Sequence, residues 1–395
     1  AGGYDNFEML KAYGGNSIRI WDTYNALKVL DKAESLGMTV TIGLEMGHER
    51  KGYNYSDKEF VKKQKERIRE EVLRLKDHPA LLMWGVGNEL DQLASNMAVW
   101  DAVNDIAKMI DELDPNHPTT TMLAGVPYKQ VEIISEKCVN LDVLAINTFK
   151  DLPYIHDKVR RAGWNRAYIV GEWGPCGYWE VDSTYWGAFI EETSTEKADG
   201  CIDRYEAQER KGINNNFVGS YIFYWGNKQA RTHTLLSLFM ETGETNAVVD
   251  ALHFLWYGKW PENRAPKISQ IKVNKTKASR SLILFPGTSN QAKVEAMDFE
   301  NDPLTYRWEI KPESRETKVG GDKEDPIPSI KGLIKNESLS EISFKSPEVD
   351  GPYRLYVYVF DKNNHVATAN FPFYVQKSKG AFVRLKNAIV RAKGM

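Results

Sequence analysis

The sequence predicts an α/β barrel followed by a β-sandwich, and three observations lead to this prediction. Up to about residue 257, short apolar runs of strand length alternate with longer segments of helical periodicity. Strict alternation of strand and helix is typical of a parallel sheet covered by helices. After the segment 258–266, the pattern changes to short strands separated by turns. The region before that change also has the usual size of a (β/α)8 barrel, which is about 250 residues.

Seven barrel strands are expected, at residues 17–21, 38–44, 80–88, 119–124, 143–149, 167–172 and 219–225. Helices are expected at 4–13, 27–36, 57–76, 97–113, 131–137, 155–162 and 247–255, with a loop and helix ending near residue 212. A closed barrel of this type needs eight strands, so the first strand is missing from this pattern. Either that strand lies upstream of Ala1, or the barrel closes in another way. A doubly wound sheet is disfavoured, because no glycine-rich phosphate loop follows any of the strands.

The region after the barrel is predicted to be an immunoglobulin-like β-sandwich, because seven short strands follow one another with turn residues between them. They are expected at 267–273, 281–285, 291–298, 304–310, 340–345, 351–361 and 365–375. We therefore expect a barrel over 1–264, a sandwich over 265–378 and a basic helical tail over 379–395. An acidic run at 298–302 could hold calcium, but an acidic turn without metal is more common, so we expect no metal site.

The balance of charged residues limits the kinds of molecule that the protein is expected to bind. The chain has 395 residues, with 52 Lys and Arg, 54 Asp and Glu, and a formal net charge of -2. This balance argues against nucleic acid as the main partner, and no apolar run is long enough to insert into a membrane. A neutral small molecule or polymer fits better. The three cysteines indicate no disulfide framework; unpaired buried thiols are favoured over a bridge between Cys176 and Cys201.

Two glutamates stand out because each follows a buried strand. The run 80–86 ends in Gly87-Asn88-Glu89, and the run 167–170 ends in Gly171-Glu172-Trp173. The carboxyl ends of parallel strands lie on one face of a sheet, so the two carboxylates are expected to converge. Either glutamate alone could be structural, at the start of a helix or in a turn, but two at matching strand ends favour a site. A facing pair of carboxyl groups is the minimum that acetal cleavage requires.

These motifs resemble the acid/base and nucleophile strands of glycoside hydrolase clan A, and the similarity over residues 1–264 is greatest with the catalytic barrel of family 2. The resemblance also covers Tyr224-Trp225-Gly226, as the eighth strand. It implies that Glu89 is the general acid/base and Glu172 the nucleophile. The other implied site residues are Asn88 on the sugar 2-hydroxyl, Arg19 orienting the nucleophile, Trp225 as the floor of the sugar subsite, and Trp173 and His48 as further substrate contacts. His48 could equally be an ordinary surface loop histidine.

The resemblance implies a retaining glycoside hydrolase that cleaves β-linked oligo- or polysaccharides by double displacement and needs no cofactor. One departure concerns the sixth strand of the family barrel, which often ends in a tyrosine that touches the nucleophile. This chain has Asn147-Thr148-Phe149 there, so the hydroxyl is absent or comes from elsewhere. The sandwich resembles bacterial modules related to polycystic-kidney-disease and cadherin-like repeats. We expect a secreted, periplasmic or cell-surface protein, and the sequence indicates no oligomeric state.

Two alternatives remain open. The first is a non-catalytic carbohydrate-binding protein on a degenerate barrel. This alternative would account for the departure at Phe149 and for the missing strand. The second is a β-glucan transglycosylase, which would use the same pair of carboxylates. Hydrolysis, binding without turnover and transfer to a sugar acceptor distinguish the three.

Overall fold

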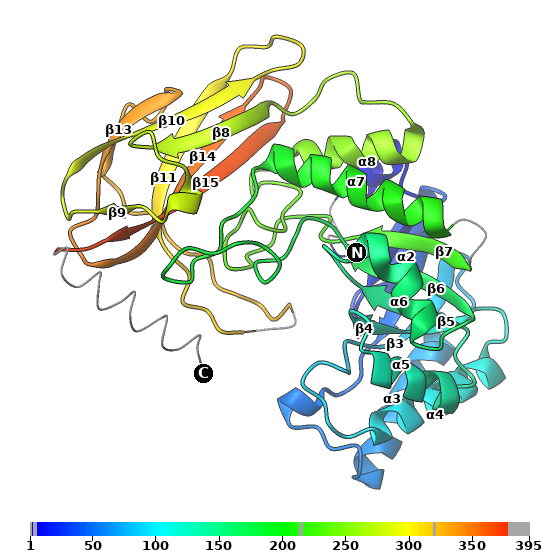
Figure 1. Ribbon diagram of the computed structural model, residues 1–395. Helices are drawn as coiled ribbons and strands as arrows, with labels where there is room; N and C mark the ends of the chain where they lie inside the picture. Colours follow the sequence, from blue (N-terminus) through cyan, green and yellow to red (C-terminus); the bar gives the residue numbers. More distant parts are fainter. Residues whose placement is uncertain (1, 3–5, 213–215, 319–320, 378–395) are drawn as a thin grey trace. The chain divides into compact units, whose positions relative to one another are not determined.

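The computed structural model describes residues 2, 6–212, 216–318 and 321–377, and the chain divides into two compact units (Figure 1). The first comprises Ala1–Gly174 and Asp203–Gly226, and the second comprises Pro175–Ile202 and Asn227–Met395. The segments 175–202 and 227–264 are thus grouped with the sandwich strands, whereas the sequence assigned them to the barrel. The expected domain limits remain predictions, and the expected tail over 379–395 lies outside the described residues.

The first unit is built on a parallel sheet whose seven strands are hydrogen-bonded in chain order. The strands are β1 (Ser17–Ile20), β2 (Thr39–Leu44), β3 (Leu81–Asn88), β4 (Thr119–Ala124), β5 (Val143–Asn147), β6 (Ala167–Trp173) and β7 (Phe217–Ile222). They form a nearly closed barrel, which confirms the predicted fold class. Side chains connect the two edges of this sheet. The Tyr221 hydroxyl on the edge strand β7 lies 3.1 Å from Ser17 Oγ on the other edge strand, β1, and 2.7 Å from Thr41 Oγ1 on its neighbour β2.

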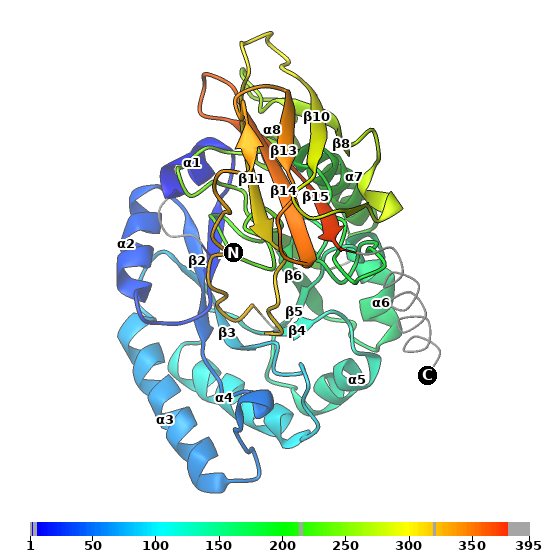
Figure 2. The ribbon, with the colours of Figure 1, turned by 90° about the vertical axis from the view of Figure 1, so that its left-hand side faces the viewer.

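Helices alternate with these strands, and Figure 2 shows α2 to α6 arranged around β2 to β6. The helices are α1 (Phe7–Ala12), α2 (Ala26–Ser35), α3 (Lys58–Leu75), α4 (Ala98–Leu113), α5 (Tyr128–Lys137), α6 (Ile155–Arg161) and α7 (Ser194–Gly212), with short 3-10 turns η1 (Glu49–Lys51) and η2 (Leu152–Tyr154). The division between the two units falls within α7. In α4, Val99, Val103, Ile106 and Ile110 are buried at helical spacing, so this helix presents one apolar face to the barrel.

The centre of the barrel is filled by side chains from several strands. Met83, Met122, Val143, Ala145, Ile169 and Tyr221 form one buried cluster. Strand β3 is buried along almost its whole length, as expected for a parallel strand that is covered on both faces. The interior of the barrel is therefore packed, and polar side chains are available for chemistry at the carboxyl ends of the strands.

The second unit contains two four-stranded sheets, β12-β13-β10-β8 and β11-β14-β15-β9. Their strands are β8 (Lys267–Val273), β9 (Ile283–Leu284), β10 (Ser289–Met297), β11 (Thr305–Pro312), β12 (Ile334–Lys335), β13 (Glu341–Lys345), β14 (Gly351–Phe360) and β15 (Val366–Val375). All pairs are antiparallel except β9 with β15. The sequence predicted every strand except β12. The unit also contains α8 (Ala247–Tyr257) and the 3-10 turn η3 (Ala278–Arg280).

Residues of both sheets form one hydrophobic core, to which Leu355, Val357 and Val359 of β14 contribute. The alternate side chains Tyr356 and Tyr358 belong to a second buried cluster. This period of two is the ordinary pattern of a strand that packs on both faces. The immunoglobulin-like topology itself stays a prediction.

Hydrogen bonds to a buried, ion-paired carboxylate connect two further segments of the second unit. Lys197 Nζ lies 2.6 Å from Glu191 Oε1, and both side chains are almost fully buried. The hydroxyls of Thr232 and Thr234 donate to the two oxygens of the same carboxylate. The segment 175–202 is thereby held to the segment that contains the threonines.

All three cysteines are buried, and no disulfide joins any of them to another described residue. Among the described residues, no helix combines the length and the apolar character that crossing a membrane would require.

Candidate active site

Glu89 stands at a sharp turn directly after β3. Gly87 and Glu89 both have positive φ angles, 75° and 50°, so the chain leaves the strand through two left-handed conformations. The Glu89 N–H donates to the carbonyl of Met122 in β4 at 2.8 Å. A non-glycine residue in this conformation carries a local cost, and the neighbouring strand holds it in place. The carboxyl group is thereby fixed at the end of the barrel where the strands terminate.

Glu172 lies near the end of β6, and its side chain receives two hydrogen bonds on one oxygen. Arg19 Nη1 donates to Oε1 at 2.9 Å, and Trp21 Nε1 donates to the same atom at 2.8 Å. Among the described residues, no group donates to Oε2. The Arg19 side chain is only 1% exposed, so it lies behind the carboxylate and orients it. This is the contact expected for Arg19, and the burial of its side chain leaves no surface with which it could also touch a substrate.

Asn147, at the end of β5, connects the two carboxylates. Its Nδ2 donates to Glu89 Oε1 at 2.9 Å and to Asn88 Oδ1 at 3.3 Å, while its Oδ1 accepts from Arg19 Nη1 at 3.4 Å. Arg19 Nη2 also donates to Asn88 Oδ1 at 2.5 Å. The structure therefore brings together Arg19, Asn88, Glu89 and Glu172, as expected, and adds two residues that sequence reasoning missed, Trp21 and Asn147. Trp21 ends the strand predicted over 17–21, and Asn147 lies near the end of the strand predicted over 143–149, so a position near a strand end was the available signal.

Burial raises the pKa of Glu89 to about 7, and the charge of Glu172 adds to this effect. The hydrogen bond from Asn147 and the charge of Arg19 act in the opposite direction, and a smaller contribution from Asp91 raises the pKa further. Burial also raises the pKa of Asp91 to about 6, and the Ala124 N–H donates to its carboxylate. Glu89 therefore keeps its proton to a higher pH than an ordinary glutamate, and the protonated form is the one that a general acid requires.

The hydrogen bonds of Asn88 define which of its amide atoms can bind a sugar. Its Oδ1 already accepts from Arg19 and Asn147. Among the described residues, no group accepts from its Nδ2. The amide N–H group is therefore the one that can reach a substrate, as a donor to a hydroxyl oxygen.

Three residues that were expected to contact the substrate do not join the cluster of Glu89, Glu172 and their hydrogen-bond partners. Trp225 is 1% exposed and its indole donates to the Asn6 carbonyl at 3.0 Å, so its ring offers no surface on which a sugar could stack. Trp173 is also 1% exposed and stacks on Tyr205. His48 precedes η1, is half-buried, and shares no hydrogen bond with either carboxylate. Trp173 is the last residue of β6, Trp225 follows β7, and both rings are buried. The sequence alone does not distinguish this outcome from a sugar-binding platform.

Phe149 stands where the family barrel often has a tyrosine, and among the described residues no tyrosine hydroxyl donates to Glu172. Phe149 is buried and meets Phe223 edge to face, with ring centroids 5.9 Å apart. The described donors to Glu172 come instead from β1 and the residue that follows it, Arg19 and Trp21.

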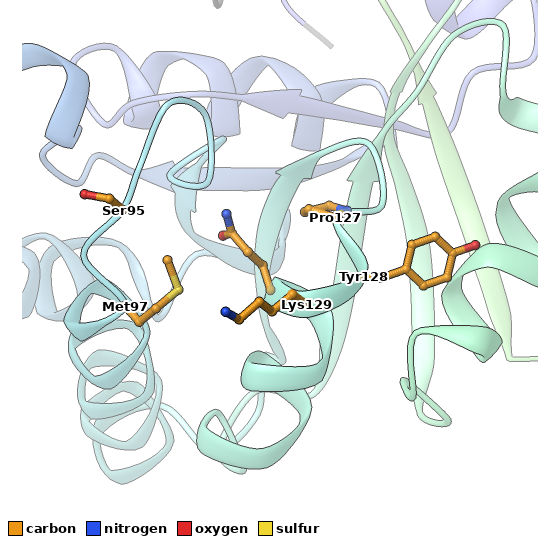
Figure 3. A pocket seen from close by; sticks show the side chains of 6 residues that line it. Ser95, Met97, Pro127, Tyr128 and Lys129 are labelled. Atoms are coloured by element: carbon orange, nitrogen blue, oxygen red, sulfur yellow. The ribbon is translucent and has the colours of Figure 1, made fainter.

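A surface hollow of about 390 Å³ lies between the loops that follow β3 and β4. It is lined by Ser95, Met97, Pro127, Tyr128, Lys129 and Gln130. Figure 3 shows Ser95 and Met97 on one side and Pro127 and Lys129 on the other, with the Tyr128 ring directed away. Its lining lacks the paired carboxylates, so it is not the chemical centre.

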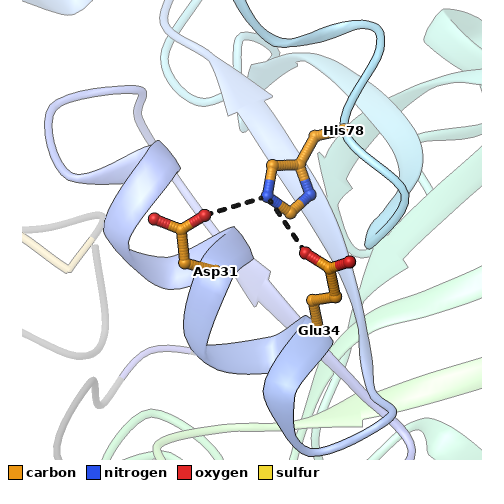
Figure 4. Close-up of side chains that lie close together, drawn as sticks. All are labelled: Asp31, Glu34 and His78. Atoms are coloured by element: carbon orange, nitrogen blue, oxygen red, sulfur yellow. Dashed lines mark hydrogen bonds and ion pairs between the residues drawn. The ribbon is translucent and has the colours of Figure 1, made fainter.

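One group of carboxylates and histidine within the described part of the chain has the spacing of metal ligands: Asp31, Glu34 and His78 (Figure 4). His78 Nδ1 accepts from the Ala80 N–H, so its Nε2 is directed at the two carboxylates, 3.2 Å from Asp31 and 3.8 Å from Glu34. Both acids are exposed on α2, and His78 lies before β3, at the opposite end of that strand from Glu89. We interpret the group as a surface ion pair.

Comparison with known proteins gives a family match and several similar folds. Residues 6–226 match the family model described as glycosyl hydrolases family 2, TIM barrel domain. No curated protein sequence matches the chain. Among solved structures, the β-glucuronidase of Ruminococcus gnavus is 14% identical with a TM-score of 0.48, over 64% of this chain and 47% of that one. The GH53 catalytic domain of Ignisphaera aggregans is 17% identical with a TM-score of 0.47, over 64% of this chain and 88% of that one.

An endo-1,4-β-mannanase from Eisenia fetida is 13% identical with a TM-score of 0.44, over 62% of this chain and 80% of that one. The chain spans about half the length of the glucuronidase chains that it matches, 47% and 53% in two examples. The family model covers more than half of the chain, includes Glu89 and Glu172, and coincides with the barrel. The chain therefore belongs to glycosyl hydrolase family 2 and contains the TIM barrel domain of that family.

Proposed function

We propose that this chain carries the catalytic domain of a retaining glycoside hydrolase that cleaves β-linked glycans, with Glu89 as general acid/base and Glu172 as nucleophile. The observation that carries the proposal is the difference between the surroundings of the two carboxyl groups. Glu89 is half-buried, and its pKa is raised to about 7, so it keeps its proton to a higher pH than an ordinary glutamate. Glu172 is buried and receives an arginine and an indole donor on a single oxygen. Environments that separate the roles of two carboxyl groups are typical of an acid and nucleophile pair.

In the first step, Glu172 Oε2 forms a bond to the anomeric carbon while the bond from that carbon to the leaving oxygen breaks. Glu89 transfers its proton to the leaving oxygen, so the departing group leaves as a neutral alcohol. In the second step, the Glu89 carboxylate takes a proton from water as the water oxygen attacks the anomeric carbon. The bond from the anomeric carbon to Oε2 breaks as the bond to the water oxygen forms, and the Glu172 carboxylate is restored.

Asn88 and Arg19 assist these two reaction steps in different ways. The amide N–H group of Asn88 is placed to donate to the sugar 2-hydroxyl, a contact that strengthens as charge develops on the ring. Arg19 holds Glu172 through Oε1 and stabilises its charge whenever the carboxylate is free. His48 stays a proposed contact of the substrate beyond the cleaved bond, while Trp173 and Trp225 are left out because they are buried.

The test is covalent labelling with a panel of 2,4-dinitrophenyl 2-deoxy-2-fluoro-β-glycosides that differ in the sugar. These reagents form the glycosyl ester quickly and hydrolyse it slowly. The proposal predicts that at least one adds one sugar mass to the protein and that peptide mapping places it on Glu172. Labelling of another residue would overturn the assignment of the nucleophile. Binding of β-glycans without labelling or turnover would favour the carbohydrate-binding alternative.

A further inference from the structure

Trp21 is placed where its indole N–H controls the orientation of the Glu172 carboxylate. It follows β1 directly and lies two residues beyond Arg19. Side chains two residues apart on an extended chain point in the same direction, so both donors reach one atom. The distances to Glu172 Oε1 are 2.8 Å from Trp21 Nε1 and 2.9 Å from Arg19 Nη1. Because Oε1 accepts both of these hydrogen bonds, Oε2 is left as the oxygen that can face a substrate.

The indole ring is held from several directions. Tyr224 lies parallel to it, with ring centroids 6.0 Å apart and an interplanar angle of 6°, and Phe223 meets it edge to face at 6.0 Å. Gly2 packs so closely that an added Cβ would lie 2.5 Å from an atom of the indole ring. On β2, a Cβ at Gly43 would lie 2.4 Å from the Trp21 carbonyl oxygen, so this glycine permits the close approach of the two chains. A ring fixed on this many sides presents its N–H without further loss of rotamer freedom.

We infer that Trp21 is a positioning residue for the nucleophilic step: its N–H, together with Arg19, holds Oε1 so that Oε2 attacks the anomeric carbon. The inference rests on the proposed function. It goes beyond it because neither the pair of carboxylates nor the family match assigns a role to this tryptophan. In the glycosyl ester, Oε1 becomes the carbonyl oxygen and keeps both donors. When the ester breaks, negative charge returns to this oxygen, so the same N–H also favours the second step.

The decisive variant replaces the indole N–H by sulfur and leaves the shape of the ring unchanged. Incorporation of β-(3-benzothienyl)alanine at position 21 does this, and Trp21→Phe is the accompanying genetic variant. Rapid-quench labelling with the 2-fluoro glycoside separates the binding constant of the reagent from the rate constant of ester formation. Because dinitrophenolate leaves without a proton, this rate does not depend on Glu89.

Loss of a hydrogen bond to a charged group corresponds to a fall of about tenfold to a hundredfold in the rate constant. We expect this fall in both variants, with the binding constant of the reagent unchanged. Trp164→Phe is the matched control, because the Trp164 indole donates to the Ala167 carbonyl at the other end of β6 at 2.8 Å. This control is expected to lose stability but to be labelled at the rate of the unaltered protein.

The outcomes separate the two proposals. If the unaltered protein is labelled on Glu172 and the sulfur variant reacts at the same rate, the role of Trp21 is overturned while the proposed function stands. A change only in the binding constant would also overturn the positioning role, because it would mean that Trp21 acts on the sugar. If the unaltered protein forms no ester with any reagent, the proposed function fails first, and the role of Trp21 fails with it.

Discussion

Asn147 Nδ2 donates to Oε1 of Glu89 at 2.9 Å, and this contact adjusts the protonation of the proposed general acid. The amide N–H stabilises the ionised carboxylate, so it partly offsets the increase that burial imposes on the pKa of Glu89. The same side chain accepts from Arg19, which also holds Glu172. The two proposed catalytic groups therefore share one polar network.

The first prediction concerns the pH dependence of Asn147→Ala. In the unaltered enzyme, kcat/KM is expected to fall above a pH of about 7, where Glu89 loses its proton. Removal of the amide donor destabilises the ionised form and raises the pKa of Glu89, so the alkaline limb should move to higher pH. The control is Asn104→Ala, whose side chain accepts from Asn140 in another part of the barrel. An alkaline limb that stays in place or moves to lower pH would contradict the account.

The second prediction concerns Asn88, whose N–H group is expected to donate to the sugar 2-hydroxyl. Asn88→Ala should lower kcat/KM for an ordinary β-glycoside by at least about tenfold, the equivalent of one hydrogen bond of ~1.4 kcal/mol. The matched comparison is the corresponding 2-deoxy glycoside, for which the variant and the unaltered enzyme should differ much less. Equal losses on the two substrates would mean that Asn88 acts only through Arg19 and Asn147.

The third prediction concerns the buried pair of Glu191 and Lys197. Lys197→Met leaves the Glu191 carboxylate without its cation, and the free energy of unfolding of the second unit should fall by roughly 3–5 kcal/mol. The double variant Glu191→Gln with Lys197→Met should recover most of that loss, because neither member of the pair is then left as a buried charge without its partner. Denaturant unfolding of the three proteins measures both differences. Equal stability of the single and double variants would show that the loss does not come from an unpaired charge.

The fourth prediction follows from the low pKa of Glu191, which is about 2 in the folded protein against an ordinary value of 4.5. Burial acts to raise this pKa, but the combined effects of Lys197, Arg354 and the hydrogen bonds outweigh it. A depressed folded pKa contributes stability that is present above pH 4.5 and is lost as the pH falls toward 2. In the Glu191→Gln variant, this part of the acid dependence should be absent. Parallel acid titrations of unfolding would test it, and identical curves would contradict it.

Much of the barrel could be predicted because its signals are local. Buried parallel strands have continuous apolar sequences. The Gly-Asn-Glu that follows the run ending at Val86 indicates a strand whose end carries polar site residues. The expected strands therefore agree with β1 to β7 within a few residues. The pairing of Glu89 with Glu172 followed from topology alone, because parallel strands end on the same face.

The remaining features depend on contacts between distant residues. An aromatic residue after a strand can form a platform or pack inward, so Trp225 was expected in the site and Trp21 was overlooked. The role of Asn147 required the arrangement of three strands, which no local pattern contains. Strand β12 has only two residues, too few for a periodic signal. The grouping of residues 175–202 with the sandwich likewise depends on buried contacts between distant residues, such as the hydrogen bond that Arg354 on β14 donates to the Phe189 carbonyl.

The central claim is that Glu172 attacks the sugar and Glu89 transfers the proton, and azide rescue tests it most directly. Glu172→Ala and Glu89→Ala are each incubated with azide and the 2,4-dinitrophenyl β-glycoside that the unaltered enzyme cleaves best. Proton NMR then gives the configuration of the glycosyl azide. The account predicts the α-azide from Glu172→Ala, because azide replaces the nucleophile, and the β-azide from Glu89→Ala, because azide attacks the glycosyl ester. The opposite assignment of the two products, or undiminished hydrolysis by Glu172→Ala, would contradict it.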